Sequence, residues 1–90
     1  MKTPTKGVKF SSRAYLDLLW WQENQPKTAA KIERLITSAY LDPLSGIGKP
    51  EQLKHDLSGW YSRRINIQDR MIYTVTEDGY LYILSVRYHY

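Results

Sequence analysis

The stretch RMIYTVTEDGYLYILSVRY, residues 70–88, decides how this chain folds. In its first part, alternate residues divide into a candidate core face and a face that carries Arg70. Its second part is an almost continuous apolar run, which is typical of a strand buried on both sides. Asp78-Gly79 lies between the two parts, and Asp-Gly is a strong hairpin signal. We therefore predict strands over residues 70–76 and 80–88, joined as an antiparallel hairpin.

Strict alternation also assigns the two faces of the last strand. One face begins apolar and turns polar at Ser85, Arg87 and His89, so we expect a site to open there. Histidine suits proton transfer near neutral pH, since its unperturbed pKa is about 6.5. An exposed terminal histidine with no role is the alternative. The opposite face would carry Tyr82, Leu84, Val86, Tyr88 and Tyr90.

A third strand is predicted over residues 60–65, with a turn at residues 66–69. Arg63 and Arg64 are adjacent in it, so one must face the core side or a partner and the other the open side of the sheet. A structural role for this pair is the simpler interpretation. The alternative is a basic surface able to grip phosphate oxygens. Its members would be Arg64, Arg70, Arg87 and His89, with Lys54 at the rim.

Two helices are predicted before this sheet. The first has Ser11 or Ser12 as its N-cap and closes at Asn24-Gln25-Pro26. The second ends at Asp42-Pro43, because a residue before proline is disfavoured in a helix. Their short junction predicts an antiparallel helix hairpin. Before the first helix, residues 8–10 suit a short edge strand. The fold class is therefore α+β, with an N-terminal short strand and a two-helix hairpin packed on a C-terminal antiparallel sheet. Apolar residues at helical spacing in the second helix are Ile32, Leu35, Ile36, Ala39 and Tyr40.

Length and composition restrict the alternatives. Ninety residues suit one domain, which we place at residues 8–90 after a flexible basic leader at residues 1–7. The absence of cysteine fits a reducing cytosol, and no apolar run is long enough to cross a bilayer, so we expect a cytoplasmic protein without a membrane partner. The net charge of +4 favours polyanions only mildly and is not confined to one half of the chain.

Several familiar chemistries find no support. The loop Gly46-Ile47-Gly48-Lys49 lacks the glycine spacing and the Ser or Thr of a P-loop. The two histidines, His55 and His89, have no metal-ligand spacing, so we expect no metal and no other cofactor. Ser58 precedes a glycine but lies outside a nucleophile-elbow context.

The chain from about residue 8 to residue 90 resembles the YoeB/Txe group of the RelE superfamily of bacterial toxins. The combination of four short motifs carries this resemblance, together with Arg70 and Tyr73: GKPE at residues 48–51, LSG at 57–59, SRRI at 62–65 and RYHY at 87–90. The chain departs from the group in its basic leader. It also has Ile47 where relatives can carry a lysine, a change expected to weaken contact with RNA.

The resemblance implies a RelE-like microbial-ribonuclease fold and a ribosome-dependent endoribonuclease that cuts mRNA without a metal and arrests translation. It makes Glu51 the general base, Arg70 the phosphate stabiliser and His89 the general acid. The chemistry is coherent, because RNA supplies its own nucleophile, the 2′-hydroxyl, and DNA lacks it. The residues expected to support RNA binding are Lys49, Lys54, Arg64, Arg87 and Tyr90.

The resemblance also implies partners. A cognate YefM/Axe-like antitoxin would fold across the toxin, and operator DNA would be contacted indirectly through that antitoxin. A homodimer is plausible, with Tyr15, Trp20 and Trp21 as candidate contacts, although core packing explains these residues equally well. Two alternative functions stay open from the residues alone: a non-catalytic domain that binds a partner or nucleic acid, and a free-standing ribonuclease.

Overall fold

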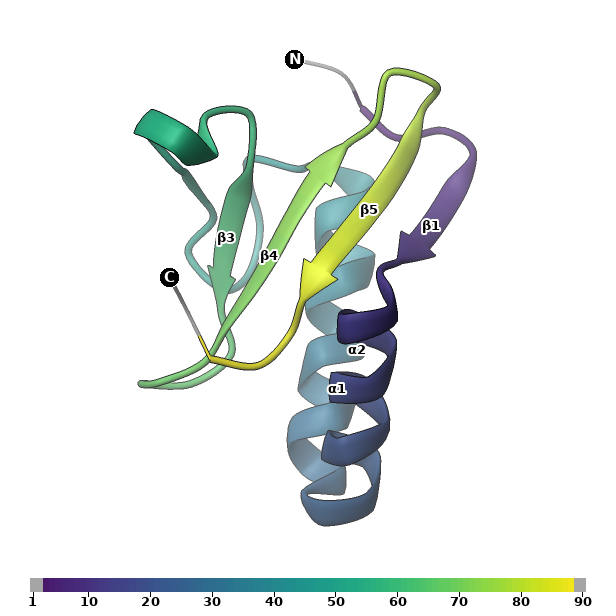
Figure 1. Ribbon diagram of the computed structural model, residues 1–90, viewed down its shortest axis with the longest axis vertical. Coiled ribbons are helices and arrows are strands. Elements are labelled where there is room, and N and C mark those ends of the chain that lie inside the picture. Colours follow the sequence, from purple (N-terminus) through teal and green to yellow (C-terminus); the bar gives the residue numbers. More distant parts are fainter. Residues whose placement is uncertain (1–2, 89–90) are drawn as a thin grey trace.

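The hairpin predicted from residues 70–88 forms the centre of the sheet (Figure 1). The computed structural model describes residues 3–88 of the chain. Within that range the sheet has five strands in the order β1-β5-β4-β3-β2. Strands β4 (Arg70–Val75) and β5 (Tyr80–Ser85) are joined by the predicted turn. The other strands are β1 (Gly7–Phe10) and β2 (Glu51–Gln52) at the two edges and β3 (Tyr61–Arg64) between β4 and β2.

The sheet is mixed rather than purely antiparallel. Strands β2 to β5 pair antiparallel, as predicted, whereas β1 lies parallel to β5, with Val8 opposite Leu81. Just before β1, the backbone N–H groups of Thr5 and Lys6 both donate to the carbonyl of Gly79, at 2.9 and 3.1 Å. The flexibility expected of residues 1–7 stays a prediction.

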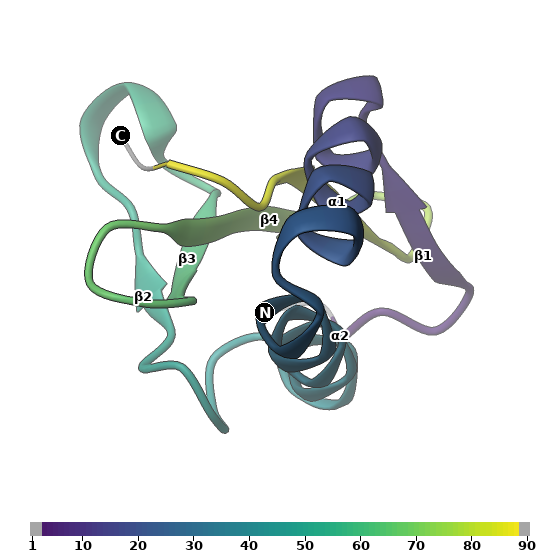
Figure 2. The ribbon, with the colours of Figure 1, turned by 90° about the horizontal axis from the view of Figure 1, so that it is seen from below.

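Helices α1 (Ser12–Asn24) and α2 (Pro26–Leu41) form the predicted antiparallel hairpin beside the sheet (Figures 1 and 2). The hydroxyl of Ser11 caps α1 by accepting a hydrogen bond from the Ala14 N–H, at 2.9 Å. The same hydroxyl donates to the Leu84 carbonyl at 2.6 Å, so the cap also ties α1 to β5. Only Gln25 separates the helices, and Pro26 occupies the first position of α2, where its missing N–H costs nothing.

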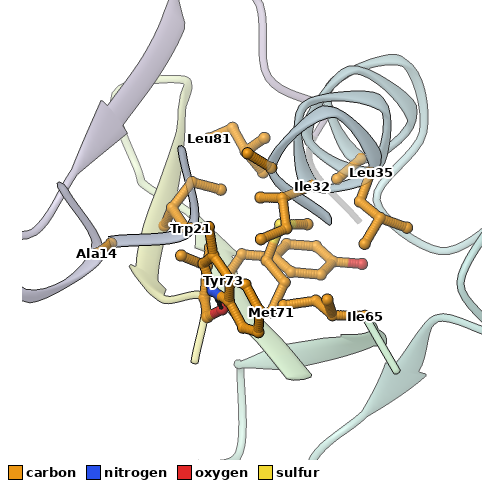
Figure 3. Close-up of a cluster of buried hydrophobic side chains, with 12 residues drawn as sticks. Ala14, Trp21, Ile32, Leu35, Ile65, Met71, Tyr73 and Leu81 are labelled. Atoms are coloured by element: carbon orange, nitrogen blue, oxygen red, sulfur yellow. Dashed lines mark hydrogen bonds between the residues drawn. The ribbon is translucent and has the colours of Figure 1, made fainter. Parts of the chain in front are cut away.

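The core lies between the helix hairpin and one face of the sheet (Figure 3). Helix α1 contributes Ala14 and Trp21, and α2 contributes the predicted stripe. Full burial of one such large apolar side chain stabilises the fold by about 1.5–3 kcal/mol. Besides Ala14 and Trp21, the buried core cluster consists of Ala29, Ile32, Leu35, Ala39, Ile65, Met71, Tyr73, Leu81, Ile83 and Val86.

The end of the last strand differs from the prediction. Strand β5 stops at Ser85, and Val86 is fully buried in the same core cluster as Ile83 rather than on the opposite face. A register irregularity next to Ile72 disturbs the strict alternation on which the face assignment depends. The indole N–H of Trp21 then donates to the Val86 carbonyl, at 2.8 Å, which fixes the chain after the strand.

Arg63 holds the loop that joins α2 to β2. Its side chain is fully buried, and its guanidinium uses all five N–H donors. Three go to loop carbonyls and two to hydroxyls: Asp42 O at 2.7 Å, Ser45 O at 2.7 Å, Ile47 O at 2.9 Å, Ser38 Oγ at 2.8 Å and Tyr73 Oη at 2.9 Å. The simpler, structural interpretation of the arginine pair is therefore confirmed for Arg63.

Tyr73 completes this network. Its hydroxyl accepts from Arg63 and donates to the Pro43 carbonyl at 2.6 Å. Burial raises the pKa of the Tyr73 hydroxyl, which keeps it protonated and able to donate. Loop backbone groups that would otherwise be unpaired are thus satisfied without regular secondary structure.

The loop is fastened to β3 at a second point. The N–H of Arg64 donates to the Gly48 carbonyl at 2.7 Å. Gly48 has a φ of 86°, and a Cβ there would lie 2.6 Å from a methyl carbon of Leu35, so both its backbone and its packing require glycine. These contacts fix the chain shortly before Glu51, the residue at which β2 begins.

We expect Arg63→Met to lower the free energy of unfolding by at least about 3 kcal/mol, because buried carbonyls would lose their donors. Arg64→Met is the matched control; this adjacent arginine is exposed, and its loss should change stability by less than about 0.5 kcal/mol. Urea denaturation of both variants measures the difference. Equal midpoints would show that the Arg63 network does not stabilise the fold.

Candidate functional site

Side chains from β2, β3, β4 and the segment after β2 line one cleft of about 430 Å³. Strand pairing brings them together: Glu51 lies opposite Ser62, and Ser62 lies opposite Ile72 on the next strand. Arg70 precedes Ile72 by two residues and so shares its face. Strands β2 and β3, which contribute Glu51 and Ser62 to the cleft, lie in the part of the sheet that extends away from the helices (Figure 2). Its lining residues are Glu51, Leu53, Lys54, His55, Leu57, Ser62, Arg70 and Ile72.

The guanidinium of Arg70 is anchored through one nitrogen. Its Nη1 donates to the carbonyls of Asn66, Ile67 and Asp69, at 2.8, 3.3 and 3.1 Å. Its Nε and Nη2 make no hydrogen bond to another of the described residues. Arg70 is therefore held in place by the preceding turn while two nitrogens stay available for an anion in the cleft.

The described end of the chain lies against Arg70. The backbone N–H of Arg70 donates to the Tyr88 carbonyl at 2.8 Å. The Tyr88 N–H donates in turn to Oδ1 of Asp69, a buried carboxylate, at 2.6 Å. Tyr88 has a φ of 65°, the left-handed region, so the chain turns sharply there. The predicted site residues His89 and Tyr90 follow and lie outside the described residues.

Arg87 does not line the cleft. Its guanidinium carbon lies 3.5 Å from the ring centre of Trp20 and 4.9 Å from that of Tyr88. This cation–π stacking holds Arg87 beside α1. Among the other candidate contacts on α1, Trp21 is buried in the core, whereas Tyr15 is 56% exposed.

Two other predicted residues lie near the cleft without lining it. Lys49 is exposed in the loop before Glu51, with a φ of 51°. Arg64 lies opposite Arg70 in the β3–β4 ladder, and the two arginines line a second depression of about 400 Å³. The other residues of this depression are Lys31, Ile65, Asn66 and Ile67.

Of the predicted catalytic and supporting residues, the cleft thus brings together Glu51, Lys54 and Arg70. Sequence reasoning gave no role in the cleft to its further polar residues, His55 and Ser62, or to Asp69, whose carboxylate accepts from the Tyr88 N–H. The turn that contains Asp69 was recognisable in the sequence, because it begins with an asparagine. The Asn66 side chain accepts from the N–H groups of Gln68 and Asp69, as expected of an asparagine-initiated turn. Ser62 had no such signal, because only strand register places it there, and His55 reaches the cleft from the short 3₁₀ helix His55–Leu57 that follows β2.

The part of the chain from residue 3 to residue 88 contains no cluster of three or more His, Cys, Asp and Glu residues able to hold a metal ion. In that same range, neither helix has the length and apolar character needed to cross a membrane.

Comparison with known proteins identifies the family. Residues 10–90 match the model of the YoeB-like toxin of bacterial type II toxin–antitoxin systems. The toxin YoeB of Synechocystis is 46% identical over 83 residues, which cover 92% of this chain and 95% of that protein.

Solved structures agree with this relationship. The YoeB dimer of Staphylococcus aureus superposes with a TM-score of 0.85 at 45% identity, covering 93% of this chain and 97% of that one. The heterotetrameric YoeB–YefM toxin–antitoxin complex from the same organism contains a chain with a TM-score of 0.84 and 44% identity, covering 92% of this chain and 95% of that one. The predicted RelE-like α+β fold is confirmed. This chain belongs to the family of YoeB-like toxins of bacterial type II toxin–antitoxin systems.

Proposed function

We propose that this protein is an endoribonuclease that cleaves mRNA on the ribosome and thereby arrests translation. The observation that carries the proposal is the cleft shared by Glu51, Lys54 and Arg70. It combines a carboxylate able to accept a proton with cations able to bind a phosphodiester. Its volume of about 430 Å³ lies in the usual range of small-ligand sites.

The proposed reaction begins at the ribose. Glu51 removes the proton of the 2′-hydroxyl, and the 2′ oxygen attacks the adjacent phosphorus. The bond from phosphorus to the 5′ oxygen breaks, and His89, as an imidazolium, gives its proton to that leaving oxygen. The products are a 2′,3′-cyclic phosphate and a free 5′-hydroxyl. The step uses side chains and requires no metal.

Arg70 stabilises the transition state in this proposal. Negative charge grows on the non-bridging phosphate oxygens as the 2′ oxygen attacks. The Nε and Nη2 groups of Arg70, which have no partner among residues 3–88, are suited to a bidentate contact with two such oxygens. Nη1 is held by three carbonyls, so the guanidinium needs little reordering on binding.

Asp69 is the residue we assign to positioning the chain end. Its carboxylate binds the Tyr88 N–H, and its own carbonyl accepts from Arg70 Nη1. One residue therefore fastens both the guanidinium and the backbone that leads directly to His89. This double contact supports the assignment of Asp69 as a positioning residue.

The relatives suggest how such a protein is controlled. The Staphylococcus aureus YoeB forms a complex with YefM and also a dimer. We propose a YefM-like antitoxin as the inhibitor of this chain, acting on operator DNA through its own DNA-binding part, and a homodimer as an assembly of the free toxin. Tyr15 is the remaining exposed aromatic candidate for the dimer contact, since Trp21 is buried and Trp20 stacks on Arg87.

We expect Glu51→Gln and His89→Gln each to reduce cleavage by about 10²- to 10⁴-fold, the usual contribution of one positioned acid or base. The measurement is mapping of mRNA 5′ ends after induction in cells, together with growth arrest. Glu33→Gln, which removes an exposed carboxylate of α2, is the matched control and should behave like the parent protein.

Three outcomes would contradict this proposal. Growth arrest by Glu51→Gln and His89→Gln at the parental level would favour the non-catalytic binding domain. An unchanged rate on mRNA with a 2′-deoxy nucleotide at the cleaved position would exclude attack by the 2′-hydroxyl. Equal rates on free RNA and on translating ribosomes would favour a free-standing ribonuclease.

We expect Asp69→Ala to lower kcat by about 100-fold with little change in KM, because misplacement of a catalytic group by about 1 Å has an effect of this size. Asp69→Asn keeps an acceptor oxygen and should recover part of the loss. Asp78→Ala is the control, since Asp78 accepts from Thr76 in the other turn of the sheet, away from the cleft. An unchanged kcat in Asp69→Ala, or a loss explained fully by unfolding in a parallel urea titration, would remove the positioning role.

A further inference from the structure

The second depression adjoins the cleft and shares Arg70 with it. Helix α2 contributes Lys31, β3 contributes Arg64 and β4 contributes Arg70. Among the described residues, these three cations are the only ionisable side chains that line the depression, whose volume is about 400 Å³. Its charge is therefore positive throughout, whereas the cleft contains Glu51.

Arg64 and Arg70 lie directly opposite one another in the antiparallel ladder. Like charges at opposed positions destabilise a sheet. No carboxylate of residues 3–88 forms an ion pair with either arginine, and the Arg64 side chain makes no hydrogen bond to another residue of that range. An anion bound between the two guanidinium groups would remove this repulsion.

Lys31 is held at the rim of the same depression. Its Nζ donates to the carbonyl of Ile65, the residue after β3, at 2.6 Å. This hydrogen bond joins α2 to the sheet. A lysine ammonium has three donors, so two stay available after this bond. The contact orders a side chain that would otherwise lose considerable rotamer freedom on binding a ligand.

We propose that this depression is a second phosphate subsite, in which Lys31 and Arg64 bind the RNA phosphate next to the one at Arg70. The inference rests on the proposed function only for the choice of RNA as the polyanion. RNA is favoured over an acidic protein segment because the depression continues from the cleft through Arg70, so one chain of successive phosphates can occupy both. The subsite directs the RNA strand from β2 across β4 toward α2.

The test measures binding without cleavage. The parent for all variants carries Glu51→Gln, and the probe is a short fluorescent single-stranded RNA, titrated at salt concentrations from about 50 to 200 mM. Lys31→Gln should weaken binding about five-fold at the lowest salt. It should also reduce the slope of log affinity against log salt by about 0.7, the value for one phosphate contact on a single strand.

Three further variants make the result specific. Lys6→Gln removes the same charge at the opposite edge of the sheet, before β1, and should leave the salt slope unchanged. Lys31→Arg keeps a cation and should retain binding, and Arg64→Gln should resemble Lys31→Gln. Lys31→Gln should weaken binding of a DNA strand of the same sequence by the same factor as binding of the RNA, because a phosphate contact does not involve the 2′-hydroxyl.

Equal salt slopes for Lys31→Gln and Lys6→Gln would overturn the subsite. So would unchanged RNA binding combined with weaker binding of a Glu-rich peptide, which would assign the depression to an acidic protein segment. Either result leaves the proposed function intact if Glu51→Gln abolishes cleavage. Conversely, cleavage that persists in Glu51→Gln would contradict the proposed mechanism without affecting the binding result.

Discussion

The buried guanidinium of Arg63 is the interaction on which the site depends. A charged group is stable in a protein interior only when its donors are matched by acceptors, and here each of the five N–H groups has one. Most of these acceptors belong to the irregular loop between α2 and β2. The same network therefore satisfies the buried charge and gives a loop without regular structure one defined path. That path ends at Glu51, whose pairing with Ser62 brings its carboxylate to the cleft.

The elements of the fold were predictable because local signals agree with the final packing. The helices follow from apolar spacing and from Pro26, and the central hairpin follows from Asp78-Gly79. The sequence also indicated that either Arg63 or Arg64 must face the core side or a partner. It could not show which one. The choice depends on the hydrogen bond to the Tyr73 hydroxyl and on backbone carbonyls whose positions cannot be inferred from the sequence.

The candidate site was predictable in part, chiefly because the resemblance to a toxin family pointed to Glu51 and Arg70. Glu51 and Arg70 line one cleft because strand pairing brings residues of β2, β3 and β4 onto one face, and Lys54 joins them from the segment just after β2. Arg87 departs from the expected basic surface because regular alternation stops with β5, and Trp20 then offers a closer partner. Lys31 is an exposed residue of α2. Its position near the sheet depends on how α2 packs, which spacing alone does not determine.

The pairing of the first strand with the last has a consequence for biosynthesis. Strand β1 is at the edge of the sheet and has β5 as its neighbour, so it cannot pair until the roughly 70 residues between the two strands and β5 itself have been made. Contacts between segments so distant in sequence slow folding, because a large loop must close before they form. The helix hairpin can assemble early from local contacts, whereas the sheet closes last. A nascent chain therefore lacks the completed sheet until β5 has been synthesised.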